Sequence, residues 1–326
     1  MKYELINFCE FDENAEKSYC AIHNISKDKN LGDITKIKEL PNCDFLTYGF
    51  PCQDISTVGN RNGIRQGTRS GLLYEVERLL ENNKYKPKFL LMENVKALTE
   101  KNHINDFKKW LEKLNDFGYI NYWQVLNSAD YNIPQNRNRI FCLSVRKDIN
   151  NGFKFPLPLP LINTLDKFID NSIDENLYGQ TALNPHQEWK QEMYKKYIEV
   201  SNGICSGVYT NQSKSFGFRP PLAHLAKTLK ANAFDVGFVK GNCVRNFTDL
   251  EYWKLQGFSE NDYNLAKSVV IKPNILKKQA GNSITINVLV EIYKQIHKYY
   301  PNDFDNLKMI SLFSGVGAFE MALKLI

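Results

Sequence analysis

Residues Met309–Ala318, with the sequence MISLFSGVGA, combine a short apolar run with a glycine-rich turn, and the helix-like stretch FEMALKLI follows. In Rossmann-type folds a buried strand ends in such a turn, where backbone N–H groups can approach a nucleotide-like ligand. On its own, S-G-V-G is more often a plain tight turn. A ligand site would also need an acidic residue about 20 positions farther on to hold a ribose.

That acidic residue appears when the sequence is closed into a circle. Nine residues follow Gly317 and ten more lead to Glu10, which ends the apolar run ELINFC, so the circular spacing is 19. We therefore expect a circular permutation with its cut in the surface loop between the first helix and the second strand, where chain ends are well tolerated.

Apolar runs alternate with helical periodicity through the first half of the chain. We expect buried strands at Phe45–Phe50, Phe89–Met92 and Ile140–Val145, and helices at Ser70–Asn83 and Asn105–Phe117. This alternation predicts an α/β fold with a Rossmann-like, mainly parallel sheet.

The pattern breaks at Asn150, where NNGFKFPLPLP places three prolines at alternate positions. Helical periodicity returns at Ser283–Tyr299, but between the two the signals are mixed, aromatic and lysine-rich. We expect a first lobe formed by residues 1–150 and 275–326, and a smaller lobe formed by residues 151–274.

The composition excludes several classes of protein. Of the 326 residues, 43% are hydrophobic and 13% aromatic, which is typical of a folded chain. No apolar run is long enough for a membrane span, and the acidic N-terminal segment does not resemble a secretory signal. The seven cysteines and five histidines show no zinc-binding spacing, so we expect no metal. We expect a cytoplasmic protein, and the net charge of +6 moderately favours a polyanionic partner.

Three further segments carry polar groups near predicted strand ends. Gly49–Ser56 (GFPCQDIS) contains a cysteine fixed by a preceding proline, and Glu93 follows the next apolar run. Arg137 and Arg139 share one face of an incoming strand. Taken singly, a packed cysteine, a helix-capping acid and surface arginines are the commoner interpretations.

Together these segments resemble the bacterial and phage cytosine C5 DNA methyltransferases of restriction-modification systems, whose blocks include F-x-G-x-G, P-C-Q, E-N-V, Q-x-R-x-R and G-N-S. The corresponding blocks, in cyclic order, are Phe313–Gly317, Pro51–Gln53, Glu93–Val95, Gln135–Arg139 and Gly281–Ser283. The resemblance covers the chain except about residues 157–221.

The resemblance implies a mechanism. Cys52 would attack C6 of cytosine as a thiolate, and Glu93, protonated or sharing a proton, would hydrogen-bond N3. Arg137 and Arg139 would orient the base carbonyl and help to hold the thiolate. The base must be flipped out of the duplex, and residues 151–274 would form the target-recognition lobe that reads double-stranded DNA.

The same resemblance implies S-adenosylmethionine as methyl donor and S-adenosylhomocysteine as product. The implied cofactor contacts at the glycine turn are Phe313, Gly315, Val316 and Gly317. Glu10 would contact the ribose, and Phe11, Asp33 and Ile34 would contact the adenine. Asn282 and Ile284 would complete the methionine pocket. The implied DNA contacts are Gln53, Ser56, Arg61, Arg69, Lys214 and Arg219.

Three alternatives remain open. A tRNA cytosine methyltransferase would share the fold and the chemistry, although its Cys-Phe-Thr block is not found here. A silent DNA-binding homologue would not need every catalytic position. A nicotinamide or flavin oxidoreductase would explain the glycine turn and Glu10, but not Cys52 or the arginines. We further expect a monomer, with a restriction endonuclease as a partner acting on the same DNA site without direct contact.

Overall fold

The computed structural model describes residues 2–51, 70–172, 188–201, 203–209, 217–231, 235–241, 243–272 and 274–326. The chain forms two compact units, and each is described by itself. The first unit comprises Met1–Leu126, Asn138–Leu157 and Val288–Ile326, and the second comprises Asn127–Arg137 and Pro158–Asn287. The second unit therefore differs from the expected 151–274 lobe at both ends: residues 127–137 and 275–287 belong to it, whereas residues 151–157 belong to the first unit.

The first unit is built on a six-stranded sheet with the order β1-β12-β2-β3-β6-β4. β12 runs parallel to both β1 and β2, β2 runs parallel to β3, and β6 runs antiparallel to β3. The predicted Rossmann-like fold class is confirmed. The strands are β1 (Tyr3–Cys9), β2 (Phe45–Tyr48), β3 (Phe89–Val95), β4 (Tyr119–Asn127), β6 (Asn138–Arg146) and β12 (Leu307–Leu312).

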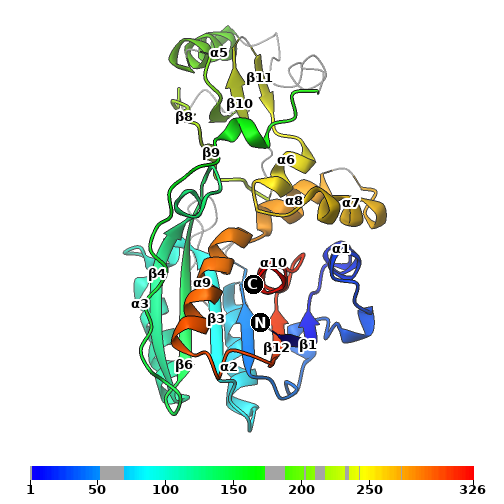
Figure 1. Ribbon diagram of the computed structural model, residues 1–326, viewed down its shortest axis with the longest axis vertical. Coiled ribbons are helices and arrows are strands. Elements are labelled where there is room, and N and C mark those ends of the chain that lie inside the picture. The colour runs from blue at the N-terminus through cyan, green and yellow to red at the C-terminus, as the bar shows by residue number, and fades with distance from the viewer. Residues whose placement is uncertain are drawn as a thin grey trace. The chain divides into compact units, whose positions relative to one another are not determined.

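Helices accompany this sheet (Figure 1). Local sequence sets their ends: the Asp12 side chain accepts hydrogen bonds from the N–H groups of Asn14 and Ala15 at the start of the first helix, and Asn24 ends it in the left-handed conformation. The helices are α1 (Glu13–His23), α2 (Leu73–Asn82), α3 (Ile104–Asp116), α9 (Ile286–Tyr299) and α10 (Ala318–Lys324), with 3-10 turns at Lys27–Lys29, Ile34–Lys36, Ser70–Leu72 and Lys96–Thr99. Two further 3-10 turns, Ser128–Tyr131 and Leu165–Phe168, belong to the second unit.

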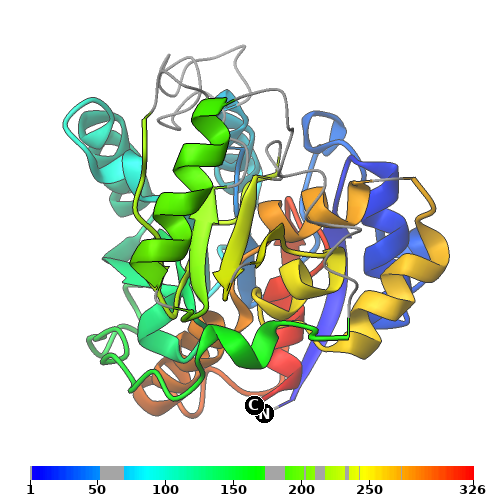
Figure 2. The same cartoon turned by 90° about the horizontal axis from the view of Figure 1, so that it is seen from above.

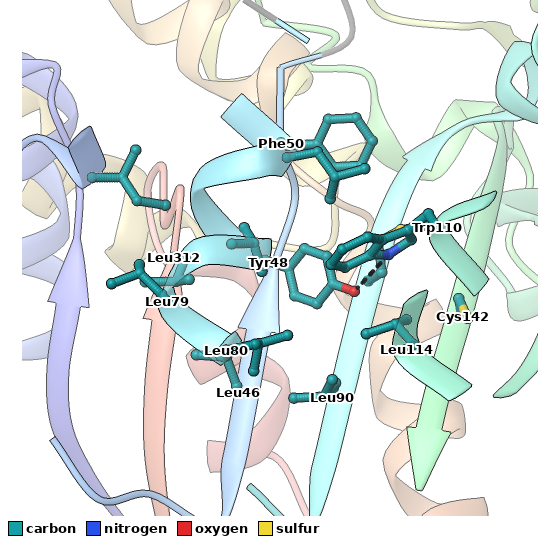
Figure 3. Packing of buried hydrophobic residues seen from close by; sticks show 14 of the residues in the cluster. Leu46, Tyr48, Phe50, Leu79, Leu80, Leu90, Trp110, Leu114, Cys142 and Leu312 are labelled. Atoms are coloured by element: carbon teal, nitrogen blue, oxygen red, sulfur yellow. Dashed lines mark hydrogen bonds between the residues drawn. The ribbon is translucent and has the colours of Figure 1, made fainter. Parts of the chain in front are cut away.

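The core between the sheet and helices α2 and α3 holds the strand ends in place. Leu46 and Leu90 on neighbouring strands are fully buried, and burial of such a side chain contributes about 1.5–3 kcal/mol. The one polar contact drawn in this cluster runs from Trp110 Nε1–H to the Tyr48 hydroxyl at 3.2 Å (Figure 3). Phe50, just beyond the end of β2, packs in the same cluster, which anchors the segment that leads to Cys52.

The second unit contains a four-stranded sheet with the order β11-β10-β7-β8. Helix α5 lies across this sheet (Figure 2), and Tyr197 on the helix packs with Val208 and Val239 from the strands. The strands are β5 (Gln135–Asn136), β7 (Ser206–Tyr209), β8 (Leu222–Ala223), β9 (Ala226–Lys227), β10 (Val236–Lys240) and β11 (Cys243–Asn246). The helices are α5 (Glu188–Ser201), α6 (Asp249–Lys254), α7 (Glu260–Val269) and α8 (Ile275–Asn282).

Within the described ranges, none of the helices has both the length and the apolar character that a membrane span requires. The described residues also hold no group of three or more His, Cys, Asp or Glu side chains placed to bind a metal ion.

Candidate active site

The described parts of the expected chemistry-bearing blocks of the first unit lie at one edge of its sheet. β1, β12, β2 and β3 are parallel, so their carboxyl ends meet at that edge, and Glu10, Phe313, Gly49 and Glu93 stand at or beside these ends. Open parallel sheets bind their ligands at this edge.

The turn from β12 to α10 has an unusual backbone. Phe313, Gly315 and Gly317 have φ angles of 55°, 57° and 81°, all in the left-handed region. Glycine adopts this conformation freely, but for Phe313 it costs roughly 1–2 kcal/mol. Because such strain persists where function requires it, the turn is the first candidate for ligand binding.

A rigid support lies beneath this turn. A Cβ atom added to Gly317 would lie 2.0 Å from His23 Nε2 and 2.9 Å from a Tyr19 ring carbon, whereas one added to Gly315 meets nothing within 4 Å. Burial, reinforced by the charge of Lys324, lowers the pKa of His23 to about 3. The neutral imidazole can therefore donate from Nε2 to the Val316 carbonyl at 3.2 Å. The Gly317 side of the turn is packed and the Gly315 side is open.

Glu10 joins the end of β1 to this turn. Its Oε1 accepts a hydrogen bond from Asp12 N at 2.8 Å, and its Oε2 accepts one from Gly315 N at 2.8 Å. Burial raises the pKa of the Glu10 carboxyl, and the bonds from Asp12 and Gly315 oppose the rise. Asn30 fixes the Glu10 backbone from both sides, through Glu10 N–H and Glu10 O. Asn30 was not among the residues predicted from the sequence.

The other expected adenosine contacts differ in their exposure. The Phe11 side chain is 80% exposed, which leaves its ring free to stack on a planar ligand. Asp33 caps the following 3-10 turn by accepting bonds from the N–H and hydroxyl of Thr35. Ile34 packs inside the hydrophobic core, so its side chain does not face the open side of the turn.

The edge between β2 and β3 holds the second part of the site. The buried Asn94 side chain donates from Nδ2 to the Phe50 carbonyl at 3.0 Å, which fixes the segment entering Pro51. A Cβ atom added to Gly49 would lie 3.5 Å from Glu93 Oε2, so the chain leaving β2 passes close to that carboxyl group. Sequence reasoning did not select Asn94 for this role.

Glu93 and Arg139, both predicted from sequence, are brought together. Arg139 Nε lies 3.1 Å from Glu93 Oε1, and the two side chains are 16% and 12% exposed. The antiparallel pairing of β3 with β6 places Arg139 opposite Val95, within reach of the Glu93 side chain. A largely buried carboxyl group held by a guanidinium can orient and polarise a heterocyclic base.

Arg137 has a different environment from the one expected. Its buried guanidinium donates to the carbonyl groups of Leu229, Gly281 and Ser283, all in the second unit. The strand is interrupted at Arg137, between β5 and β6, so the period-two argument that paired it with Arg139 does not apply. The Arg137 guanidinium is therefore hydrogen-bonded within the second unit.

The remaining predicted residues divide into two groups. In the second unit, Asn282 is exposed at the end of α8, Ile284 is 8% exposed, and Arg219 is exposed. Cys52, Gln53, Ser56, Arg61, Arg69 and Lys214 lie outside the described residues.

Comparison with known proteins identifies the family. The model of the C-5 cytosine-specific DNA methylase family matches residues 1–298. The type II methyltransferase M2.ScrFI of Lactococcus lactis subsp. cremoris is 36% identical over 276 residues, covering 83% of this chain and 72% of that protein. The type II methyltransferase M.Bsp6I of Bacillus sp. (strain RFL6) is 31% identical over 307 residues, covering 91% and 92%.

Among solved structures, the Dnmt2 methyltransferase of S. pombe has a TM-score of 0.60 at 17% identity and 92% coverage of both chains, which supports the fold alone. The matched range includes Glu93 and Arg139, which form the ion pair at the sheet edge, and ends before the glycine turn at Phe313–Gly317. The chain belongs to the C-5 cytosine-specific DNA methylase family and is a DNA cytosine-5-methyltransferase.

Proposed function

We propose that this enzyme methylates C5 of cytosine within a specific sequence of double-stranded DNA, with S-adenosylmethionine as methyl donor. The observation that carries the proposal is the Glu93–Arg139 pair at the same sheet edge as the strained turn and Glu10. S-adenosylmethionine supplies an electrophilic methyl group and leaves as S-adenosylhomocysteine.

The residues at the β12–α10 turn fit this donor. The open space beside Gly315 admits a ligand against backbone N–H groups, and the Glu10 carboxyl retains lone pairs that can accept from ribose hydroxyls. The exposed Phe11 ring is suited to stacking on adenine. Asp33 would contact the adenine from the neighbouring loop, while Ile34 contributes through its backbone. In the second unit, Asn282 and Ile284 remain candidates for the methionine pocket.

The base chemistry needs a covalent step because cytosine C5 is a poor nucleophile. We infer that the Cys52 thiolate forms a bond to C6, which makes C5 electron-rich enough to accept the methyl group. Glu93 hydrogen-bonds N3 and Arg139 holds both Glu93 and the base carbonyl, so the charge that develops on the ring is stabilised. Loss of the C5 proton then returns the electron pair that breaks the bond between Cys52 and C6.

None of these groups can reach C6 inside a duplex, so the base is flipped out. Residues 151–274 supply most of the second unit, and we propose that this unit reads the DNA, with Arg219 as one contact. Gln53, Ser56, Arg61, Arg69 and Lys214 remain candidates for DNA contacts. Arg137 would act by positioning, since its guanidinium holds the carbonyls on either side of Asn282.

We also propose that the order of blocks arose by circular permutation. The glycine-turn block comes last in the sequence, yet its strand β12 lies between β1 and β2 and is parallel to both. The first and last segments are close in space: Tyr3 OH donates to Glu320 O at 3.3 Å, and the N and C labels lie near one another in both views (Figures 1 and 2).

We also propose a cellular location, an oligomeric state and a partner for the enzyme. A DNA substrate in a bacterial or phage context implies action in the cytoplasm. We propose that it acts as a monomer and that a restriction endonuclease shares its DNA site without direct contact, as the type II designation of its relatives suggests.

The covalent mechanism is tested with duplex DNA in which 5-fluorocytosine replaces cytosine. Fluorine at C5 cannot be removed as a proton is, so the bond between Cys52 and C6 should persist after methyl transfer. We expect a stable protein–DNA adduct with wild type and none with Cys52→Ala. An equal yield of adduct with Cys52→Ala would refute the role of Cys52.

A further inference from the structure

Three cationic side chains gather around one tyrosine in the second unit. The Tyr209 ring centroid lies 4.6 Å from Lys230 Nζ, 5.2 Å from Lys227 Nζ and 5.9 Å from the guanidinium carbon of Arg219. Asp235 pairs with Lys230 at 3.3 Å, so these three cations and one carboxylate have a formal charge of +2 among themselves. We call Tyr209, Arg219, Lys227 and Lys230 the Tyr209 cluster.

The backbone that carries two of these cations is firmly held. Thr228 Oγ1 donates to Asn136 O at 2.6 Å, and Leu229 N donates to Gln135 Oε1 at 3.1 Å. Arg137 donates to the Leu229 carbonyl at 2.9 Å. On the other side, a Cβ atom added to Gly281 would lie 2.5 Å from the Lys230 carbonyl. Lys227 and Lys230 therefore start from fixed positions, which lowers the entropy lost when they bind a ligand.

The positive charges of the Tyr209 cluster repel one another. Burial and the neighbouring Arg219 both lower the pKa of Lys227. The Lys227 ammonium group donates to the Pro220 carbonyl at 2.7 Å, and an ammonium group has three donors in all. The simpler interpretation is that aliphatic stems pack on a ring, as Lys267 does alone over Tyr263 at 5.6 Å. That interpretation explains one lysine packed on a ring, but it does not explain why three cations lie around the same ring.

We propose that the Tyr209 cluster is a phosphate-binding site for the backbone of duplex DNA. The inference rests on the proposed function of the second unit and adds the kind of contact made there. Lysine binds phosphate as a point charge and arginine can bind it with two donors, whereas phosphate contacts carry no sequence information. The cluster thus anchors and orients the DNA, while other residues read its bases. Lys227 was not among the DNA contacts expected from sequence.

The proposal is tested by DNA binding measured by fluorescence anisotropy between 50 and 200 mM salt, for Arg219→Gln, Lys227→Gln and Lys230→Gln. The matched control is Lys267→Gln, which removes an equal charge from a ring contact elsewhere in the second unit. Each lost phosphate contact should reduce the slope of log K against log salt by about 0.9. The loss of DNA affinity relative to wild type should therefore become about threefold smaller between 50 and 200 mM salt. The loss should be equal for duplexes of unrelated sequence.

Asp235→Asn provides a test of opposite sign. It removes the carboxylate that neutralises Lys230, so DNA binding should tighten and the salt slope should steepen. Slopes unchanged from wild type, a loss confined to one sequence, or weaker binding by Asp235→Asn would overturn the proposal.

Assays of the wild-type protein distinguish a failure of the phosphate-site proposal from a failure of the proposed function. If it transfers methyl groups to duplex DNA but the Tyr209 cluster variants behave like Lys267→Gln, only the phosphate site is refuted. If it neither binds nor methylates duplex DNA, both fail together.

Discussion

Two glycines in one turn respond differently to the same added methyl group. Gly315 and Gly317 both have left-handed φ angles, so an alanine at either position costs roughly 1–2 kcal/mol of backbone strain. At Gly317 the new Cβ would also meet the His23 and Tyr19 rings, 2.0 and 2.9 Å away. Tyr19 is fully buried and stacked on Phe8 with ring centroids 4.0 Å apart, so it cannot move aside without disturbing the core.

Overpacking of this kind costs a further ~1–3 kcal/mol. We therefore expect Gly317→Ala to lower the free energy of unfolding by about 2–5 kcal/mol and Gly315→Ala by only about 1–2 kcal/mol. Both alanines keep the backbone N–H, so the bond from residue 315 to Glu10 remains available. Gly315→Ala should instead raise the KM for S-adenosylmethionine, because its methyl group enters the open side of the turn.

Hydrogen exchange of the β12 amides in increasing urea measures the local unfolding free energy of this region, and steady-state kinetics at saturating DNA give the KM. Equal losses of stability in the two variants would refute the packing argument. An unchanged KM for Gly315→Ala would refute the assignment of the open side to the methyl donor.

Three further outcomes follow from buried groups and from chain order. Arg137→Ala leaves three buried carbonyls without their donor, so the second unit should lose roughly 3–6 kcal/mol, with Arg137→Lys intermediate; limited proteolysis with mapped cleavage sites measures this. Burial raises the pKa of Glu320, so its ionisation disfavours the folded state as pH rises from the unfolded pKa toward the folded one. The stability of Glu320→Gln relative to wild type should therefore increase from pH 4 to pH 7 in urea titrations, and a flat difference would contradict the assignment. A chain with residues 307–326, which hold the whole of β12 and α10, moved ahead of residue 1 should keep the circular dichroism spectrum and activity of wild type, and misfolding would count against the permutation.

The strands of the first unit could be predicted because strands buried on both faces are continuously apolar. The runs at Phe45–Phe50, Phe89–Met92 and Ile140–Val145 correspond to β2, β3 and β6. The second unit gave no comparable pattern, since its strands are short. Two of its helices nevertheless carried a usable signal: Thr248 with Glu251 and Ser259 with Asp262 form capping boxes at the starts of α6 and α7.

The candidate site was predictable only in part. Glu93 and Arg139 meet because strand ends in one sheet are brought to one edge, which the order of blocks implies. Arg137 could not be placed, because the argument assumed an unbroken strand and the chain changes units at that residue. The supports His23, Asn30 and Asn94 act through contacts with distant segments; no local pattern marks His23 or Asn30, and the E-N-V block includes Asn94 without indicating its contact with Phe50.

DNA cytosine methylation is tested by transfer of labelled methyl from S-adenosylmethionine to mixed-sequence duplex DNA and, in parallel, to bulk tRNA, followed by base analysis. We expect label in DNA as 5-methylcytosine with wild type and none with Cys52→Ala. Label in tRNA alone would contradict the DNA substrate, and donor binding without any transfer would instead indicate a catalytically silent DNA-binding protein.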